Sequence, residues 1–290
     1  MRRRLFLAAP GLTLVAAAGN PPLRAVASFS LLADMLGRIG GDRVAITTLV
    51  PVDGDAHSYQ PRPADARAVT AAQLVAENGL GIDHWMDRLI QATAFAGIVS
   101  VATAAVSPRG MAGGTAIDPH AWQDPRNGML YAQALAAGLA AADSSHAAVY
   151  RAAAAAYGEE IRRLDSWIAE QFAPIPATAR RIITTHDAFG YYGARYGVAF
   201  LAAQGLSTEG EPSAKAIAAL VAQIKRENIR AVFLENMTDP RLAQMLMRET
   251  GASLGGTVYS DALSGPKGPA PTYLDMLRHN TTLFTASMRR

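Results

Sequence analysis

The feature that most constrains the fold of this chain is a regular alternation between short apolar runs and longer amphipathic stretches. In the first half the runs are AVASF (25–29), VAITTLV (44–50), QLVAENG (73–79) and IVSVAT (98–103). In the second half they are RIITT (181–185), VAFLA (198–202), AVFLE (231–235) and GGTVYS (255–260). Helical patterns separate these runs, and such an order is typical of parallel sheets covered by helices. Because 50% of the residues are hydrophobic, the chain can fill two α/β cores.

A long helical stretch separates the two halves. It begins near Ser144, ends near Phe172 and is followed by PIPAT. A helix of about 28 residues spans roughly 42 Å, which is enough to pack along one lobe or to join two. We interpret it as a rigid connection between two α/β lobes. The expected division is a signal peptide at 1–18, an N-terminal lobe at 19–143, the connecting helix at 144–173 and a C-terminal lobe at 174–290.

The N-terminus has the pattern of an export signal. Three arginines precede an apolar run that ends in three alanines before Gly19. Pro10 and Gly11 interrupt the run before it reaches the roughly 20 residues that a membrane span needs. We therefore predict cleavage near Ala18. The order Arg-Arg-Leu-Phe-Leu also resembles a twin-arginine signal, so the secretory and twin-arginine routes both stay open.

The net charge and the absence of cysteine exclude several classes of function and of binding site. The chain has 27 basic and 24 acidic residues, and removal of the signal with its three arginines leaves the two signs balanced. A balanced charge gives no bulk electrostatic attraction to nucleic acid or to an anionic membrane. The absence of cysteine excludes disulfides, thiolate metal sites and a lipidated cysteine. We expect an unlipidated, soluble protein in a periplasm.

Four potential metal ligands lie at positions where a parallel sheet presents binding groups. Ligands of open α/β sheets sit outside the carboxyl ends of the strands. The four side chains are His57 after the run 44–50, His120 in AIDPHAWQDP, His186 after the run 181–185 and Asp261 after the run 255–260. Two come from each lobe, so they could converge on a cleft between the lobes. The other histidines, His84, His146 and His279, follow no strand, and we assign them surface or packing roles.

Six segments of the chain together resemble the metal-binding solute receptors of zinc and manganese ABC importers. They are DAHSYQP (55–61), NGLGID (78–83), DPHAWQDPRN (118–127), THDAFGYYGARYG (185–197), EPSAK (211–215) and YSDALS (259–264), in the order of that family. The likeness extends over essentially the whole chain after the signal. Two departures stand out: the first segment has Ala56 where the family commonly has proline, and the segment 107–117 lacks the His- and Asp-rich capture insert of many zinc receptors.

The resemblance implies a fold and a function. In that family, two lobes joined by a rigid long helix hold one metal ion between them, and the ligand roles fall on His57, His120, His186 and Asp261. It implies a monomeric periplasmic receptor without enzymatic activity that delivers its ion to an ABC transporter permease and its ATPase. A periplasmic metallochaperone is a further candidate partner.

The chemistry of these four side chains indicates zinc. Three neutral imidazoles and one carboxylate suit a tetrahedral Zn²⁺ site. Manganese prefers oxygen-rich sites, and receptors of the family that favour it often carry a carboxylate at the third position, which here is His186. We therefore expect Zn²⁺ as the transported ion. A receptor for Mn²⁺ or iron remains the alternative, because geometry and metal supply also decide occupancy.

Nearby carboxylates are candidates to hydrogen-bond the second ring nitrogen of a ligating histidine, which fixes its tautomer. They are Asp55, Asp118, Asp187, Glu209 and Glu211.

Two other classes of protein remain as alternatives to a metal receptor. An exported zinc hydrolase would need Asp261 outside the coordination sphere and a base such as Glu209. An adhesin or structural protein would need the metal only for folding.

Overall fold

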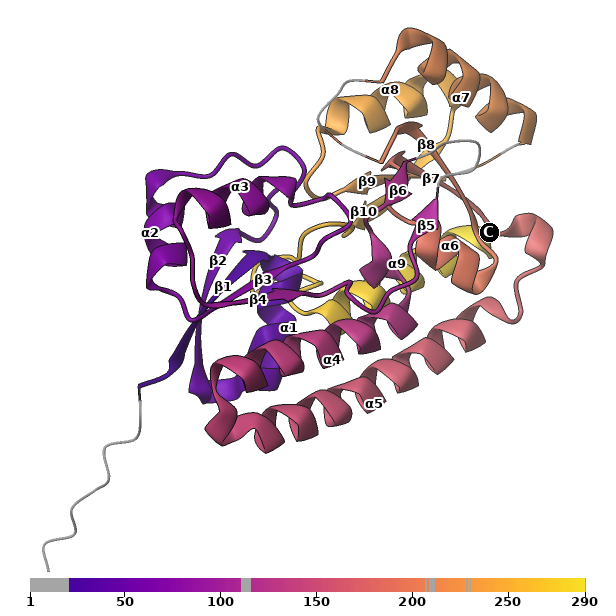
Figure 1. The fold of residues 1–290 in the computed structure, drawn as a ribbon. Coiled ribbons are helices and arrows are strands. Elements are labelled where there is room, and N and C mark those ends of the chain that lie inside the picture. The colour runs from indigo at the N-terminus through magenta and orange to yellow at the C-terminus, as the bar shows by residue number, and fades with distance from the viewer. Residues whose placement is uncertain are drawn as a thin grey trace, which may run out of the picture.

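The computed structural model describes residues 21–110, 116–206, 208, 212–227, 229 and 231–289. The signal peptide predicted at 1–18 lies outside these residues, and so do Glu209, Glu211 and the middle of the segment 107–117. Figure 1 shows two α/β lobes side by side, each built on its own sheet, with two long helices running beneath them.

The sheet of the N-terminal lobe has four parallel strands in the order β2-β1-β3-β4. They are β1 (Leu23–Phe29), β2 (Val44–Val50), β3 (Leu74–Glu77) and β4 (Ile98–Val101). The helical elements of this lobe are α1 (Ser30–Gly40), η1 (Gly41–Arg43), α2 (Pro63–Ala71), α3 (His84–Ala92) and α4 (Pro125–Ala142). The inner strand β1 is buried at all but one position, as expected for a parallel strand with both faces covered.

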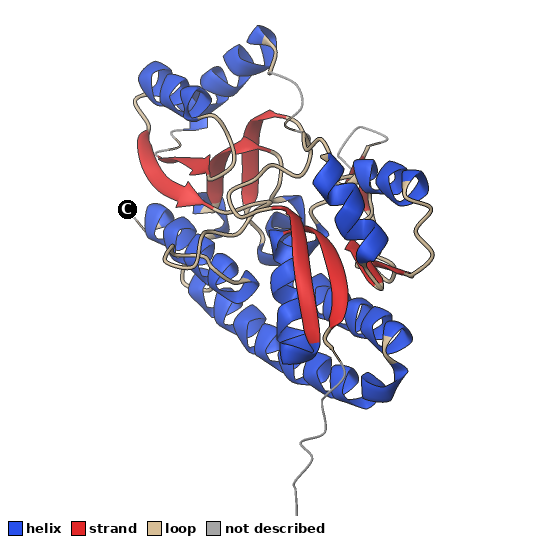
Figure 2. Ribbon diagram, turned by 90° about the vertical axis from the view of Figure 1, so that its left-hand side faces the viewer, coloured by secondary structure: helices blue, strands red, loops and turns tan. Residues whose placement is uncertain are grey.

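The sheet of the C-terminal lobe repeats this plan in the order β10-β9-β7-β8, again with parallel pairing. Its strands are β7 (Arg181–His186), β8 (Ala199–Gln204), β9 (Ala231–Glu235) and β10 (Ser253–Val258). The helical elements are η4 (Ala177–Ala179), α6 (Gly190–Tyr196), α7 (Ala214–Glu227), α8 (Pro240–Thr250) and α9 (Tyr273–Met288). In Figure 2, α7 and α8 lie over one side of this sheet.

A short antiparallel pair links the N-terminal sheet to the long helices. It consists of β5 (Arg109–Gly110) and β6 (Ile117–Asp118), and the chain then passes through the turn η2 (Ala121–Gln123) into α4. The side chain of Asp124 accepts a hydrogen bond from Arg126 N, and Pro125 occupies the first turn of α4. This is the N-cap and first-turn proline combination that favours a helix start.

The long helix is both a packed element and a connection between the lobes. After the turn η3 (Ser144–His146), α5 (Ala147–Phe172) runs for 26 residues. It lies alongside α4, as Figure 1 shows, and it also contacts α1, α6 and α9. The helix begins three residues after the predicted start at 144 because those residues form η3.

Two hydrophobic cores hold the described part of the chain together. The larger core joins the N-terminal sheet, α1, α4 and α5 to aromatic residues of the second half such as Tyr192, Phe233 and Phe284. The smaller core lies between the C-terminal sheet and the helices α7 and α8 and includes Ile183 and Leu246. The larger core therefore crosses the boundary between the lobes.

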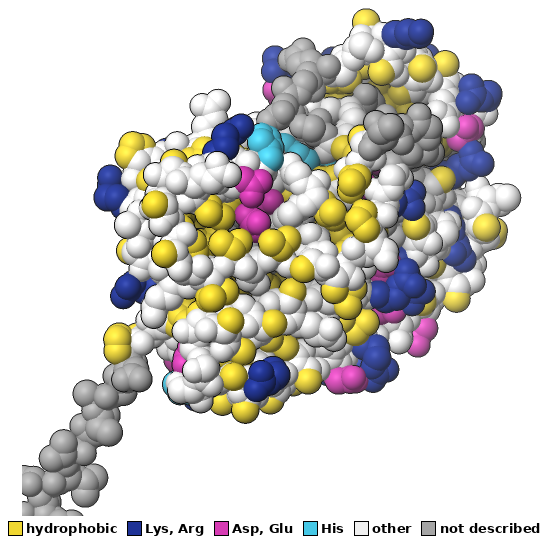
Figure 3. All heavy atoms as spheres, in the orientation of Figure 1, with side chains coloured by type: hydrophobic (Ala, Val, Ile, Leu, Met, Phe, Trp, Pro, Cys, Tyr) yellow, Lys and Arg dark blue, Asp and Glu magenta, His cyan; other side chains and the backbone are white. Residues whose placement is uncertain are grey.

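Charged side chains are spread over the surface. On the face drawn in Figure 3, the Lys and Arg side chains of the described residues lie scattered and form no continuous patch. Among the described helices, none combines the length and the hydropathy that a membrane crossing requires.

Candidate metal centre

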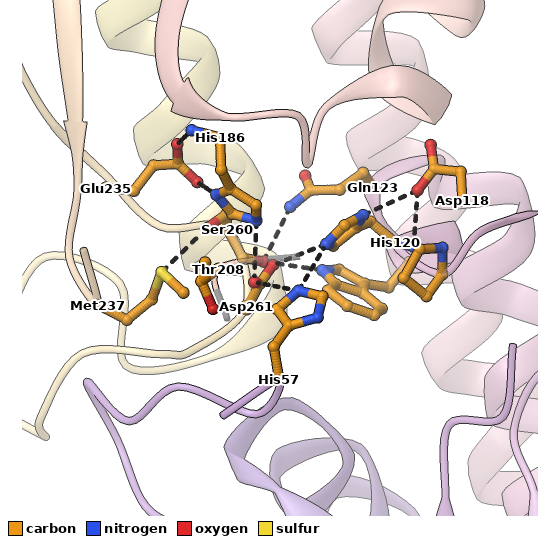
Figure 4. Close-up of polar contacts among 12 residues, drawn as sticks. His57, Asp118, His120, Gln123, His186, Thr208, Glu235, Met237, Ser260 and Asp261 are labelled. Carbon is orange, nitrogen blue, oxygen red and sulfur yellow. Dashed lines mark hydrogen bonds and ion pairs between the residues drawn. The ribbon is translucent and has the colours of Figure 1, made fainter. Parts of the chain in front are cut away.

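Four buried side chains come together between the two sheets. Each contributes one atom able to bind a metal, and these atoms all lie within 4.8 Å of one another. The four residues are His57, His120, His186 and Asp261. Figure 4 shows the three imidazole rings directed toward the carboxylate of Asp261. The positions selected from strand ends thus meet in one place.

Each candidate ligand lies in a loop or at the end of a strand. His57 lies in the loop between β2 and α2, and His120 lies two residues after β6. His186 is the last residue of β7, and Asp261 follows β10 by three residues. Two of the four come from each half of the chain, and the carboxyl ends of parallel strands bring His57, His186 and Asp261 to the same region. His120 differs from the expectation, because it follows β6 of the antiparallel pair and not a strand of a parallel sheet.

The distances within the group are those of atoms that share a small space. Asp261 Oδ2 lies 3.3 Å from His57 Nε2 and 3.2 Å from His186 Nε2. Asp261 Oδ1 lies 3.6 Å from His120 Nε2, and the Nε2 atoms of His57 and His120 are 3.2 Å apart. All three histidines therefore present the same ring nitrogen to one carboxylate.

Several of these atoms are buried without a hydrogen bond. Among the described residues, neither oxygen of Asp261 nor Nε2 of His186 has a hydrogen-bond partner. A buried polar group left unpaired costs about 1–3 kcal/mol. A cation at the centre of the four side chains would satisfy these atoms at once, so the donor set fits a divalent transition metal.

Asp118 holds the ring of His120. Its Oδ1 lies 2.8 Å from His120 Nδ1 and also accepts a hydrogen bond from His120 N at 3.0 Å. A proton on Nδ1 then leaves Nε2 free for a metal. Asp118 is one of the carboxylates that the sequence suggested as partners of a ligating histidine, and its distances to His120 are those of hydrogen bonds.

Glu235 lies in the corresponding position beside His186, where it forms an ion pair with the ring, and sequence reasoning missed it. Glu235 ends β9, and its Oε2 lies 2.5 Å from His186 Nδ1. Its Oε1 accepts hydrogen bonds from His186 N at 2.8 Å and from Thr185 Oγ1 at 2.7 Å. The sequence could have indicated Glu235, because it ends the apolar run 231–235. His186 was selected by the same criterion, since it follows the apolar run 181–185.

Asp55 supports the His57 loop through its backbone. Its Oδ1 accepts a hydrogen bond from His57 N at 2.9 Å, and its Oδ2 accepts from Ser58 Oγ at 2.8 Å and from Thr208 Oγ1 at 2.6 Å. Thr208 follows β8, so this carboxylate also connects the loop to the C-terminal half.

Asp187 is another carboxylate that the sequence suggested as a partner of a ligating histidine. Within the described residues, it makes no hydrogen bond to the three clustered histidines. Burial raises the pKa of Asp187.

Four hydrogen bonds tie the loop that carries Asp261 to the N-terminal half of the chain. The carbonyl of Ser260 accepts hydrogen bonds from Trp122 Nε1 and Gln123 Nε2, both at 2.9 Å. Leu263 N donates to Ser30 Oγ, and Leu263 O accepts from Asp53 N, both at 3.0 Å. Asp261 is therefore tied to the N-terminal half, whereas the backbone N–H of His186 is tied to its own sheet through Glu235.

His186 and Asp261 shift each other's pKa. Burial alone would lower the pKa of His186, but the negative charges of Glu235 and Asp261 outweigh it and raise that pKa well above its usual value. Burial alone would raise the pKa of Asp261, but the charges of His186 and His120 hold it well below its usual value. Without a metal, this cluster therefore stabilises a proton on His186.

The remaining histidines have local contacts outside the cluster. His84 Nδ1 lies 3.3 Å from the carbonyl of Gly81, and His146 Nδ1 lies 2.7 Å from Asp143 Oδ2. His279 Nε2 lies 2.9 Å from the carbonyl of Thr257. These contacts fit the packing and surface roles expected for all three residues.

Comparisons with known proteins point to metal receptors. Residues 25–287 match the family model described as the periplasmic zinc-uptake complex component A. The chain is 32% identical to the manganese-binding lipoprotein MntA of Halalkalibacterium halodurans over 92% of this chain and 88% of that protein. It is 30% identical to the iron-binding protein YfeA of Yersinia pestis over 90% of this chain and 84% of that protein.

Solved structures of such receptors share the fold. The periplasmic zinc binding protein TroA of Treponema pallidum superimposes with a TM-score of 0.88 at 25% identity, covering 93% of this chain and all of the other. The manganese-bound periplasmic metal binding protein of Candidatus Liberibacter asiaticus gives a TM-score of 0.83 at 30% identity, covering 92% of this chain and 99% of the other.

Proposed function

The chain belongs to the family of periplasmic zinc-uptake component A, and from this premise we propose that its cargo is Zn²⁺. It is the metal-binding, substrate-binding component of an ABC transporter, so it works with a permease and an ATPase. The family consists of substrate-binding receptors and not of enzymes, so the exported zinc hydrolase considered from the sequence is set aside. Its place of action is the periplasm or another extracytoplasmic compartment.

The proposed ligands are the Nε2 atoms of three histidines and the carboxylate of Asp261. The observation that supports them is the convergence of all four side chains within 4.8 Å. Three imidazoles with one carboxylate form a donor set suited to tetrahedral zinc, whereas manganese prefers more oxygen ligands. The names of the relatives do not decide the metal, because they include manganese, iron and zinc proteins.

The N-terminal processing of the protein is a further part of the proposal. Several relatives are named lipoproteins, which is at odds with the unlipidated protein expected from the sequence. This chain has no cysteine among its 290 residues, and a cysteine is the usual site of lipid attachment in such receptors. We therefore retain a cleaved signal at 1–18 without a lipid. Intact mass of the exported protein tests it, because a lipid adduct or retention of residues 1–18 would contradict it.

The domain division and the remaining partners also stay proposals. The lobes at 19–143 and 174–290, separated by the connecting helix at 144–173, are supported by one four-stranded sheet on each side of α5. A monomeric state and delivery by a periplasmic metallochaperone rest on the family resemblance alone.

Native mass spectrometry combined with metal analysis tests the proposed cargo directly. The protein is purified from the periplasm of its own organism without chelators. We expect one zinc ion per chain. A single manganese or iron ion in its place would contradict zinc as the cargo and would support the alternative receptor. Bound metal that persists in a variant lacking all four proposed ligands would contradict the site.

A further inference from the structure

We propose that Glu235 is a positioning residue for the metal centre: it holds the imidazole of His186 with Nδ1 protonated and Nε2 directed at the metal. The inference rests on the ligand set proposed above and adds a residue to it. Glu235 does not touch the metal in this scheme. It acts through His186, to which it is hydrogen-bonded at the backbone and paired at the ring.

The register of the C-terminal sheet places Glu235 beside His186. In the parallel pair of β7 and β9, Ile183 lies opposite Val232. Three positions further along, the two strands reach His186 and Glu235, which therefore point to the same side of the sheet. The two residues are 49 positions apart in the sequence. Their contact depends on this strand pairing and has no local sequence pattern.

The buried surroundings of Glu235 indicate a specific role for its negative charge. The side chain is fully buried, and an ionised carboxylate is costly to bury unless it is paired and hydrogen-bonded. Oε1 accepts two hydrogen bonds, from His186 N and Thr185 Oγ1. Oε2 lies 2.5 Å from His186 Nδ1. Both oxygens are thus directed at His186 or its neighbour.

The position of the second oxygen determines which ring nitrogen is available. An ionised carboxylate oxygen has no proton to donate, so its 2.5 Å contact with Nδ1 of His186 favours a proton on Nδ1. The metal-binding lone pair then resides on Nε2, the atom 3.2 Å from Asp261 Oδ2. A carboxylate behind a ligating histidine also makes the imidazole a stronger donor.

The substitution Glu235→Gln separates this role from simple packing. Glutamine has nearly the same shape, and its carbonyl oxygen can keep the hydrogen bonds from Thr185 and from His186 N. Its amide nitrogen would then face Nδ1 and donate to it, which favours the tautomer with the proton on Nε2. We expect zinc affinity to fall by roughly 10- to 100-fold, as is usual when such a partner is lost. A purely structural role predicts that glutamine preserves the affinity.

The measurement is competition titration against a zinc chelator, with circular dichroism to confirm the fold. Asp165→Asn is the matched control, because Asp165 is also a buried carboxylate but pairs with Arg195 and Tyr196. It should leave zinc affinity unchanged. His186→Ala is measured in parallel. If His186→Ala binds zinc like wild type, the proposed ligand set fails. If His186→Ala weakens binding but Glu235→Gln does not, only the role of Glu235 is overturned.

The first part of a second measurement uses only the wild-type protein, so it does not depend on the folding of a variant. In the zinc-loaded wild-type protein, nitrogen-15 NMR of the histidine side chains should show His186 with a proton on Nδ1 and the metal on Nε2. The variant Glu235→Asp keeps the charge on a shorter side chain, so the Nδ1 proton should persist with an intermediate zinc affinity. A zinc-loaded wild type in which His186 lacks the Nδ1 proton, or binds through Nδ1, would overturn the proposal.

Discussion

The backbone carbonyl of Ser260 accepts a hydrogen bond from Trp122 Nε1 at 2.9 Å, although the two residues are 138 positions apart. Ser260 precedes the proposed ligand Asp261, and Trp122 follows the proposed ligand His120 by two residues. Gln123 Nε2 donates to the same carbonyl. One oxygen atom thus couples the loops of two ligands from different halves of the chain.

Trp122→Phe tests this coupling. The substitution removes one donor and keeps an aromatic ring that can pack in the same place, so the free energy of unfolding should fall by about 1 kcal/mol. Zinc affinity should also fall, because the loop of Asp261 is held less firmly. Urea unfolding and chelator competition measure the two effects. Trp167→Phe, on α5, serves as the control and should not change zinc affinity; unchanged zinc affinity in Trp122→Phe would argue against the coupling.

Alanine substitutions test the ligand set. Replacing a proposed ligand removes a metal bond and should weaken Zn²⁺ binding by at least the roughly 10- to 100-fold that loss of a supporting residue costs. The variants are His57→Ala, His120→Ala, His186→Ala and Asp261→Ala. The matched controls His84→Ala, His146→Ala and His279→Ala should bind zinc like wild type. Weaker binding in a control together with normal binding in His57→Ala would refute the site.

Zinc binding should release a proton. The pKa of His186 is raised well above its usual value by Glu235 and Asp261, so the metal-free protein favours a proton on this ring. Zinc must displace it, and we expect roughly one proton released per ion near pH 7. Titration calorimetry in buffers of different ionisation enthalpy measures that number. An observed enthalpy independent of the buffer would contradict the assignment.

The same shifts predict how stability and affinity depend on pH. In the metal-free protein, the raised pKa of His186 contributes stability below its unfolded value of about 6.5, and this contribution is lost as pH rises through the folded pKa. The lowered pKa of Asp261 contributes stability above about 4, lost as pH falls further. Zinc affinity should fall with decreasing pH because protons compete for imidazole. Thermal unfolding with and without zinc should show the two trends.

His186→Glu tests the basis of metal selectivity. The change replaces a neutral nitrogen donor with an anionic oxygen donor, so Zn²⁺ should lose more affinity than Mn²⁺, even if zinc still binds more tightly. The quantity to measure is the ratio of the two dissociation constants in the same buffer for wild type and variant. An unchanged ratio with both metals bound would show that His186 does not set the preference. A loss of both metals would show that glutamate cannot reach the position of the imidazole.

Much of the fold and the meeting of the four proposed ligands could be predicted from the sequence. Alternation of apolar runs with amphipathic stretches indicates parallel sheets, because each helix must cover a face of the sheet. Parallel strands all present their carboxyl ends at one edge, so polar residues after those runs were expected to meet. This reasoning from strand ends selected His57, His120, His186 and Asp261. It also found Asp118, whose carboxylate is only two residues from His120.

Only the tertiary structure showed which groups from distant parts of the chain support those residues. Glu235 reaches His186 because β9 pairs with β7 in one particular register, and a shift by one residue would turn its side chain to the opposite face. Trp122 and Gln123 reach Ser260 because the loops of both halves meet above the two sheets. Periodicity in a sequence reports which face of an element is buried. It carries no information about which distant element lies beside it, because that choice depends on the packing of the whole chain.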